Sequence, residues 1–247
     1  MFSIFKKKQK GITDLSELVT DMHSHLLPGI DDGSPDVTVS AELITGLKDL
    51  GYTRLVTTPH IMWDMYKNDQ QSISGAKEQL HHFVNGNDGL PLRAAAEYFL
   101  DDHIDDLLSK NVPLLTIRDN WVLVEFSFVN PPMDLRQKLF SLQMKGYQPV
   151  LAHPERYTYL SRTRHVYDEL KNAGCYFQVN LLSLTNYYGK PANELANYLI
   201  KMKYVDLLGT DMHHDRHLHA LRSSPHLTDI AKQLLDSGRL LNPSIQF

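Results

Sequence analysis

The sequence predicts an α/β barrel formed by a single domain over residues 1–247. Seven short apolar segments alternate with segments of helical character, the pattern of repeated strand–helix units. Segments such as 121–126 are apolar almost throughout, as in parallel strands that are covered on both faces. Histidines and carboxylates recur where these segments end, and the carboxyl ends of barrel strands are where such folds build their active sites. A chain of 247 residues, 42% of them hydrophobic, suffices for one such domain.

The elements follow in regular order. We expect strands at 18–24, 54–59, 91–98, 120–126, 148–153, 175–180 and 205–211, and helices at 35–50, 69–84, 101–110, 132–146, 163–173, 191–203 and 225–237. Ser34 before Pro35 predicts a cap and a first-turn proline for the first helix. Gly51, Gly146 and Gly174 stand where helices should stop. The alternation implies a closed or nearly closed barrel, with a surface loop around 85–89.

Composition excludes several classes of function. A formal net charge of −4 gives no general attraction to nucleic acid or to anionic membranes. The lone Cys175 excludes an internal disulfide framework, and no apolar stretch reaches the roughly 18 residues of a membrane span. The first ten residues lack the apolar region of a secretory signal, so we expect a cytoplasmic protein. Residues 1–12 are expected to form a short mobile arm, with membrane or partner contact as the alternative.

The first strand ends in two histidines. His23 and His25 are two residues apart, so in an extended strand both imidazoles project from one face. Asp31 and Asp32 follow before Gly33, in a turn whose carboxylates can reach back over the strand ends. The alternative for these aspartates is turn formation or helix capping.

The next three strands end in one histidine and two glutamates. His60 follows Pro59, Glu97 ends an alanine-rich segment, and Glu125 ends an apolar one. Burying a carboxylate in such surroundings is costly unless a cation or a donor compensates its charge. A bound metal ion would provide that compensation.

The fifth and seventh strands complete the set. His153 ends the fifth, and Asp211 and His213 end the seventh, again two residues apart. Each residue alone has a structural explanation, but a metal centre explains all of them together. The candidate ligands are His23, His25, Asp32, His60, Glu97, Glu125, His153, Asp211 and His213.

The segments DMHSH, DDG, TTPH, AAEYF, EF, HPER and GTDMH, in this order, resemble the polymerase and histidinol phosphatase (PHP) superfamily. Within it, the chain is most similar to the bacterial metal-dependent protein-tyrosine phosphatases of capsule and exopolysaccharide synthesis. The resemblance spans about residues 21–222. It implies a distorted seven-stranded (β/α) barrel, a TIM-like fold.

The resemblance also implies three divalent metal ions, of manganese, with iron, cobalt or zinc as alternatives. The first ion would be held by His23, His25, Glu97 and Asp211. Glu97 would bridge to a second ion, which Glu125 and His153 also bind. Asp32, His60 and His213 would hold the third. Imidazole and carboxylate ligands accept most divalent metals, so the ligand types leave the metal open.

Arginines are the candidate phosphate-binding residues. Arg156 lies three residues after His153, and its planar guanidinium can bind two phosphate oxygens, the alternative being a surface ion pair. The family places a second arginine shortly after the last ligand. Arg216 stands slightly nearer than that spacing, and Arg222 is its rival. Asp215 or His214 could protonate the leaving oxygen.

The resemblance implies hydrolysis of phosphotyrosine in a protein, for which we expect a tyrosine kinase of polysaccharide export. The alternatives are a small-molecule phosphomonoesterase such as histidinol phosphatase, and a non-catalytic metal-binding or scaffold module. Four tyrosines could line the mouth of the site and accept an aromatic ring, or pack in the core or rim: Tyr157, Tyr159, Tyr187 and Tyr188. Met62, Trp63 and Tyr66, just past His60, are expected to form a mobile apolar lip. Cys175 is expected to be a buried strand residue and not a nucleophile.

Overall fold

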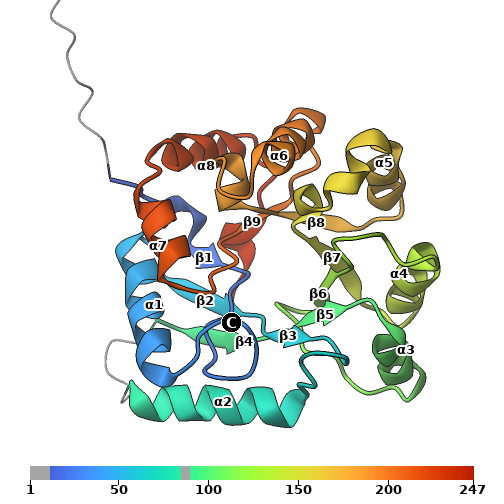
Figure 1. Cartoon of the computed structure of the whole chain (residues 1–247), viewed down its shortest axis with the longest axis horizontal. Coiled ribbons are helices and arrows are strands. Elements are labelled where there is room, and N and C mark those ends of the chain that lie inside the picture. The colour runs from blue at the N-terminus through green and yellow to red at the C-terminus, as the bar shows by residue number, and fades with distance from the viewer. Residues whose placement is uncertain (1–11, 85–89) are drawn as a thin grey trace, which may run out of the picture.

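The computed structural model describes residues 12–84 and 90–247. The arm expected at 1–12 lies outside the described residues except for Ile12, and so does the surface loop expected at 85–89. In the described part of the chain, parallel strands are surrounded by an outer ring of helices (Figure 1). Within the same part, no helix combines the length and the apolar character needed to cross a membrane.

The strands form two parallel sheets. The three-stranded sheet has the order β1-β2-β4, and the six-stranded sheet has the order β3-β5-β6-β7-β8-β9. The first contains β1 (Thr20–Asp21), β2 (Arg54–Thr57) and β4 (Leu92–Ala94). The second contains β3 (His60–Ile61), β5 (Glu97–Phe99), β6 (Trp121–Glu125), β7 (Gln148–Ala152), β8 (Tyr176–Asn180) and β9 (Leu207–Gly209). The expected α/β class with parallel strands is confirmed.

At two places the chain passes from the three-stranded sheet to the six-stranded sheet. The strand expected at 54–59 is confirmed only as β2, and β3 begins one residue after the expected end. The strand expected at 91–98 is interrupted, and its two parts belong to β4 and β5. Pro59 has no N–H to donate at the first of these breaks. The backbone stays connected across the breaks, because Ala95 N donates to Thr57 O (2.8 Å) and Glu97 N donates to Pro59 O (3.0 Å).

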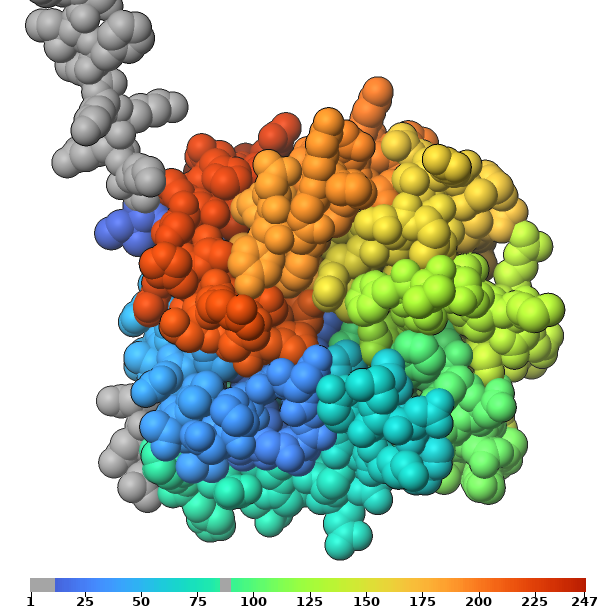
Figure 2. Space-filling model, in the orientation of Figure 1, coloured from blue at the N-terminus to red at the C-terminus, as the bar shows by residue number. Residues whose placement is uncertain are grey.

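A backbone bridge joins the sheets at their other edges. Beyond β1 and β9, Ser24 pairs in parallel with Met212, and His25 N donates to Met212 O at 2.8 Å. Asp211 N also donates to His23 O at 2.8 Å. Segments from the beginning, middle and end of the sequence therefore meet around the centre of the molecule, as the blue, green and orange-red parts do in the space-filling view (Figure 2).

Eight α-helices cover the sheets in the described part of the chain (Figure 1). They are α1 (Val37–Asp49), α2 (Gln70–Phe83), α3 (Asp102–Ser109), α4 (Leu135–Met144), α5 (His165–Asn172), α6 (Lys190–Met202), α7 (Asp215–Arg222) and α8 (His226–Asp236). Short 3₁₀ turns lie at η1 (Ser16–Leu18), η2 (Pro154–Arg156), η3 (Thr158–Arg162), η4 (Leu181–Leu184) and η5 (Asn242–Ser244). The seven expected helices are confirmed to within a few residues at their ends, whereas α7 was not expected.

The helix ends show one correction and one confirmation. Asp36, and not Ser34, caps α1, because its carboxylate accepts hydrogen bonds from Thr38 N and Val39 N. Ser34 instead donates its hydroxyl to Asp36 O. The glycines expected to end helices do adopt left-handed conformations, with φ of 100° at Gly51, 85° at Gly146 and 82° at Gly174.

Alternation along the strands places the ligands above a small interior core. On β6, Val122 and Val124 belong to the large apolar cluster shared with the helices, whereas Leu123 belongs to a smaller cluster. That smaller cluster also contains Val150 from the neighbouring strand β7. Side chains two residues apart share a face of a strand, so Glu125 follows Leu123 on the inner face. The near-continuous apolar character of this strand therefore reflects two different cores.

Candidate metal centre

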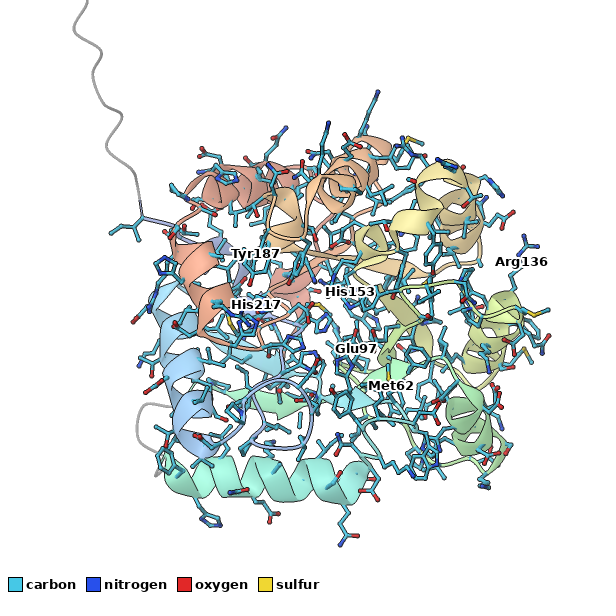
Figure 3. All side chains as sticks on the ribbon, in the orientation of Figure 1. Met62, Glu97, Arg136, His153, Tyr187 and His217 are labelled. Atoms are coloured by element: carbon cyan, nitrogen blue, oxygen red, sulfur yellow. The ribbon has the colours of Figure 1, made fainter. Side chains whose placement is uncertain are left out.

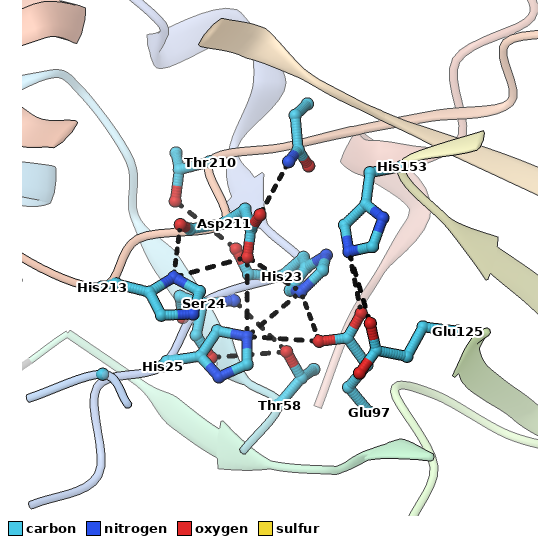
Figure 4. Close-up of polar contacts among 12 residues, drawn as sticks. His23, Ser24, His25, Thr58, Glu97, Glu125, His153, Thr210, Asp211 and His213 are labelled. Carbon is cyan, nitrogen blue, oxygen red and sulfur yellow. Dashed lines mark hydrogen bonds and ion pairs between the residues drawn. The ribbon is translucent and has the colours of Figure 1, made fainter. Parts of the chain in front are cut away.

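The candidate ligands converge in one cluster, much of which is shown in Figure 4. Glu125 ends β6 and His153 directly follows β7, as expected. His60 and Glu97 are instead the first residues of β3 and β5, at the breaks between the two sheets.

His23 Nε2 lies 3.1 Å from Glu97 Oε2 and 3.3 Å from Asp211 Oδ1. His25 Nε2 lies 3.3 Å and 3.5 Å from the same two oxygens. All four residues are buried. These side chains are the set that the family resemblance implies for the first ion.

Glu97 faces a second group through its other oxygen. Glu97 Oε1 lies 3.1 Å from His153 Nε2, and Glu125 Oε2 lies 3.9 Å from the same nitrogen. The other oxygen of Glu125, Oε1, lies 2.9 Å from His60 Nδ1. The arrangement suits a bridging role for Glu97 because its two oxygens point to different partners.

The third group lies nearer to solvent. Asp32 Oδ1 is 3.4 Å from His60 Nε2 and 3.5 Å from His213 Nε2. The side chain of Asp32 is 53% exposed, whereas those of Glu97 and Glu125 are almost completely buried. His60 contacts both Glu125 and Asp32, so it lies between the second group and the third.

The candidate ligands are suited to divalent ions, because several of their buried polar atoms have no hydrogen-bond partner. Glu97 Oε1, Glu125 Oε1 and His60 Nδ1 are buried and form no hydrogen bond, although their neighbours are only about 3 Å away. Atoms bound about 2.1 Å from one ion lie roughly 3.0–3.4 Å from each other without forming hydrogen bonds among themselves. Four groups of His, Asp and Glu in the described residues have ligand atoms within 4.8 Å of one another. Together they contain all nine candidate ligands.

Neighbouring side chains orient the imidazoles. His23 Nδ1 lies 2.7 Å from Gln178 Oε1, and His25 Nδ1 lies 2.8 Å from Asp31 Oδ2. These contacts direct the Nε2 atoms of both histidines toward the ligand cluster. Sequence reasoning missed Gln178, whose signal was its place near the end of β8. It also left Asp31 open as a turn residue.

Gly33 lets the aspartate turn close over His25. A Cβ atom at Gly33 would lie 2.3 Å from His25 O, so a larger residue would push the turn away. With glycine there, Gly33 N donates to Asp31 Oδ1, and Asp31 Oδ2 accepts from His60 N at 3.1 Å. One carboxylate therefore positions the turn, His25 and the start of β3 together.

The cluster requires positive charge. Burial alone would lower the pKa of His23, but the charges of Glu97 and Asp211 outweigh burial and raise this pKa to about 10. Burial would raise the pKa of Glu97 and Asp211, yet the neighbouring histidines hold both well below their ordinary range. Protons and metal ions therefore compete for the same site, since metal-bound imidazole must be neutral.

Two ligands stand at sharp turns of the backbone. His153 has φ of 34° and Asp211 has φ of 52°. Residues other than glycine are uncommon at positive φ, and such conformations concentrate at functional sites. His153 directly follows β7, and Asp211 lies two residues after the end of β9, where the chain leaves the sheet.

A cavity of about 240 Å³ opens over the ligand cluster. Arg156 lines it, with Nη1 3.1 Å from Asp211 Oδ2. Its other lining residues are Asp32, His60, Glu125, Phe128, His153, Tyr188, Asp211, His213, His214 and His217. The side-chain view shows Glu97, His153 and His217 near the centre of the molecule and Arg136 at its outer edge (Figure 3).

The structure does not bring the other three candidate catalytic or phosphate-binding residues into this cavity. Asp215 and Arg216 are exposed in the first turn of α7. Arg222 stands at the end of that helix, where it forms an exposed ion pair with Asp49 at 2.8 Å. The physical reason is α7 itself, because the helix carries the chain away from the ligands. His214 and His217 line the cavity instead, and His214 caps α7 through its side chain.

The aromatic candidates divide between the mouth and the core. Tyr188 lines the cavity, whereas Tyr157 is buried and stacks on Phe126 at 4.0 Å. Trp63 stacks on His103, also at 4.0 Å, which fixes the segment that follows β3. Cys175 is confirmed as a buried residue, and burial raises the pKa of its thiol to about 12.

Known proteins share this sequence pattern and fold. Tyrosine-protein phosphatase YwqE of Bacillus subtilis is 30% identical over 196 residues, which cover 78% of this chain and 76% of the relative. Tyrosine-protein phosphatase CpsB of Streptococcus pneumoniae is 29% identical over 201 residues, which cover 78% and 82%.

Solved structures of known proteins also resemble this chain. A structure from work on YwqE of B. subtilis and CpsB of S. pneumoniae, described as unique metal-dependent tyrosine phosphatases, matches with a TM-score of 0.78 and 25% identity. It covers 92% of this chain and 90% of the other. The histidinol phosphate phosphatase of Lactococcus lactis has a TM-score of 0.50 at 15% identity, over 86% and 92% of the chains, a similarity of fold alone.

The family model described as capsular polysaccharide synthesis, CpsB/CapC, matches residues 19–236. That range includes all nine candidate metal ligands and Arg156. The protein therefore belongs to the CpsB/CapC family of capsular polysaccharide synthesis.

Proposed function

We propose that this protein is a metal-dependent protein-tyrosine phosphatase. One observation carries the proposal: buried carboxylates and imidazoles with unsatisfied ligand atoms lie beneath Arg156 in a single cavity. The relatives named as tyrosine-protein phosphatases support the same activity. The substrate would be phosphotyrosine in a protein, and the family's link to capsule synthesis favours a tyrosine kinase of polysaccharide export.

The cofactor we propose is a set of three divalent ions, with manganese as the native metal. Glu97 would bridge the first two ions, and Asp32, His60 and His213 would hold the third. Bound divalent ions lower the pKa of a coordinated water and neutralise phosphate oxygens. The four groups of donor atoms overlap through His23, His25, His60 and Glu97, which supports a cluster of several ions with shared ligands.

The protein's own residues would bind and orient the phosphate ester. Arg156 would donate hydrogen bonds to two phosphate oxygens, while its contact with Asp211 keeps the guanidinium over the cluster. His214 would donate from Nε2 to the leaving phenolic oxygen, because its Nδ1 accepts a hydrogen bond from His217 N at 3.3 Å. A phenol with a pKa near 10 needs less protonation to leave than an alkyl alcohol does.

Two structural proposals accompany this function. We propose that the two sheets together form one distorted (β/α) barrel, which the backbone bridge between Ser24 and Met212 supports. We also propose a cytoplasmic location, which the single buried cysteine supports because no disulfide is needed.

A comparison of substrates tests the proposal. Purified protein loaded with manganese should hydrolyse a phosphotyrosine peptide much faster than a phosphoserine peptide or histidinol phosphate, and chelation should abolish the activity. Preference for histidinol phosphate by orders of magnitude would assign the chain to the small-molecule phosphatases. Activity that survives complete metal removal would exclude the metal mechanism.

A further inference from the structure

Two aromatic rings contact the guanidinium of Arg156. Its Cζ lies 4.6 Å from the centre of the Phe128 ring and 4.4 Å from the centre of the Tyr188 ring. Phe128 comes from the loop after β6, and Tyr188 comes from the segment between η4 and α6. A cation over an aromatic face is attracted by the ring, more strongly where water is excluded. Both rings line the cavity together with Arg156.

These contacts restrict the one cationic side chain of the cavity that can bind phosphate. Among the lysines and arginines that the structure describes, Arg156 alone lines the cavity. An arginine side chain has about 2 kcal/mol of rotamer entropy to lose on being ordered. The two rings and the contact with Asp211 hold the guanidinium before substrate arrives, so phosphate binding need not order it.

The Tyr188 ring contacts α7, the helix that follows the last candidate ligand, His213. The Tyr188 hydroxyl lies 3.5 Å from His217 Nε2, and His217 Nδ1 accepts a hydrogen bond from His213 N at 3.2 Å. Tyr187 packs edge-on against both Tyr188 and His217. The ring is therefore fixed relative to His213, and through it to the metal centre.

We propose that Phe128 and Tyr188 form an aromatic clamp of positioning residues, which holds the guanidinium of Arg156 in place to receive the phosphate of the substrate. The clamp rests on the proposed function, because Arg156 must bind phosphate for its position to matter. The clamp is proposed to act through Arg156. Phe128 also lies 5.5 Å, between ring centres, from His153, so the metal content of each variant distinguishes an effect on the metal centre.

Matched substitutions distinguish the effect of an aromatic ring from that of an apolar side chain without a ring. Phe128→Leu and Tyr188→Leu remove the ring, whereas Phe128→Tyr and Tyr188→Phe keep it. We expect each leucine variant to weaken competitive inhibition by inorganic phosphate, and kcat/KM for a phosphotyrosine peptide, by about tenfold. The aromatic variants should recover most of that loss. Phe128 is 47% exposed, so Phe128→Leu should fold normally, which metal content and thermal unfolding would verify.

A double-mutant cycle tests whether Phe128 affects activity through Arg156. If the clamp acts through Arg156, then Phe128→Leu should cost less than about twofold in an Arg156→Ala background. An effect of Phe128→Leu on the peptide KM that leaves phosphate inhibition unchanged would overturn the inference, because it would indicate contact with the substrate ring. Normal activity in Arg156→Ala would overturn the proposed function instead, whereas impaired Arg156→Ala with unaffected leucine variants would overturn the clamp alone.

Discussion

Replacing Glu97 by glutamine should empty most of the metal centre while leaving the shape of the side chain nearly unchanged. Glu97 Oε2 lies within 3.1–3.4 Å of His23, His25 and His60, and Glu97 Oε1 lies 3.1 Å from His153. No other candidate carboxylate of the described residues approaches so many imidazoles. The substitution therefore removes one negative charge from the middle of the donor set.

The size of the effect follows from this geometry. Two unit charges about 4 Å apart interact by about 4 kcal/mol at an effective dielectric constant of about 20. A divalent ion beside Glu97 would be closer and doubly charged. We therefore expect the affinity for each ion that contacts Glu97 to fall by at least about 10³-fold. Phosphatase activity should fall with the metal content.

Elemental analysis after dialysis, together with calorimetric titration with Mn²⁺, measures the change. Glu155→Gln is the matched control, because Glu155 is equally buried and lies two residues from His153. Its Oε1 instead accepts hydrogen bonds from Ser183 Oγ and Asn180 N. Glu155→Gln should keep its metal. Full metal content in a folded Glu97→Gln protein would refute the bridging role.

Three further predictions concern phosphate, imidazole orientation and pH. Arg156→Ala should lower turnover of a phosphotyrosine peptide by about 10²- to 10³-fold at full metal content, and near-normal kinetics would remove Arg156 from the mechanism. Asp31→Asn should weaken metal binding by about 10- to 100-fold in a Mn²⁺ titration, because the carboxylate that orients His25 is lost; unchanged affinity would leave Asp31 as a turn residue only. The pKa of His23, about 10 in the folded metal-free protein, exceeds its ordinary value. Its contribution to the stability of that protein should therefore be complete below about pH 6.5 and lost as the pH rises through about 10, as followed by chemical denaturation. If the free energy of unfolding of the metal-free protein did not change over this pH range, protonated His23 would not stabilise that protein.

Much of the site could be predicted from the sequence because its residues occupy one kind of position. A ligand at the end of a parallel strand is recognised locally, and the fold then brings all strand ends together. His23, Glu97 and His153 illustrate this, since each ends a separate apolar segment and all three meet in the cluster. No knowledge of long-range contacts was needed to select them.

The second phosphate-binding residue could not be predicted in the same way. The segment that forms α7 is polar, with an N-cap formed by His214, which is not a usual capping residue. Without that helix, Arg216 and Arg222 both looked close enough to the last ligand. The helix turns Arg216 toward solvent and places Arg222 beside Asp49.

The supporting contacts also depended on tertiary geometry. Sequence spacing did not assign Asp31 the role of orienting His25, because its direction depends on how the turn at Gly33 packs against His25. A buried amide such as that of Gln178 can form its hydrogen bonds with many different partners, so the sequence does not indicate which partner it has. Only the approach of β8 to the first strand gives it the role of orienting His23.

The division of the strands into two sheets gives bound metal a mechanical consequence. His23, His25 and Asp32 follow the three-stranded sheet, whereas the other six ligands belong to the six-stranded sheet or the loops at its ends. Ions bound by ligands from both groups would link the two sheets at a boundary that few backbone hydrogen bonds cross. Loss of metal would then weaken the contact between the two sheets before it affected the hydrogen bonds within either sheet. The same ions would therefore bind the phosphate and stabilise the arrangement of the two sheets.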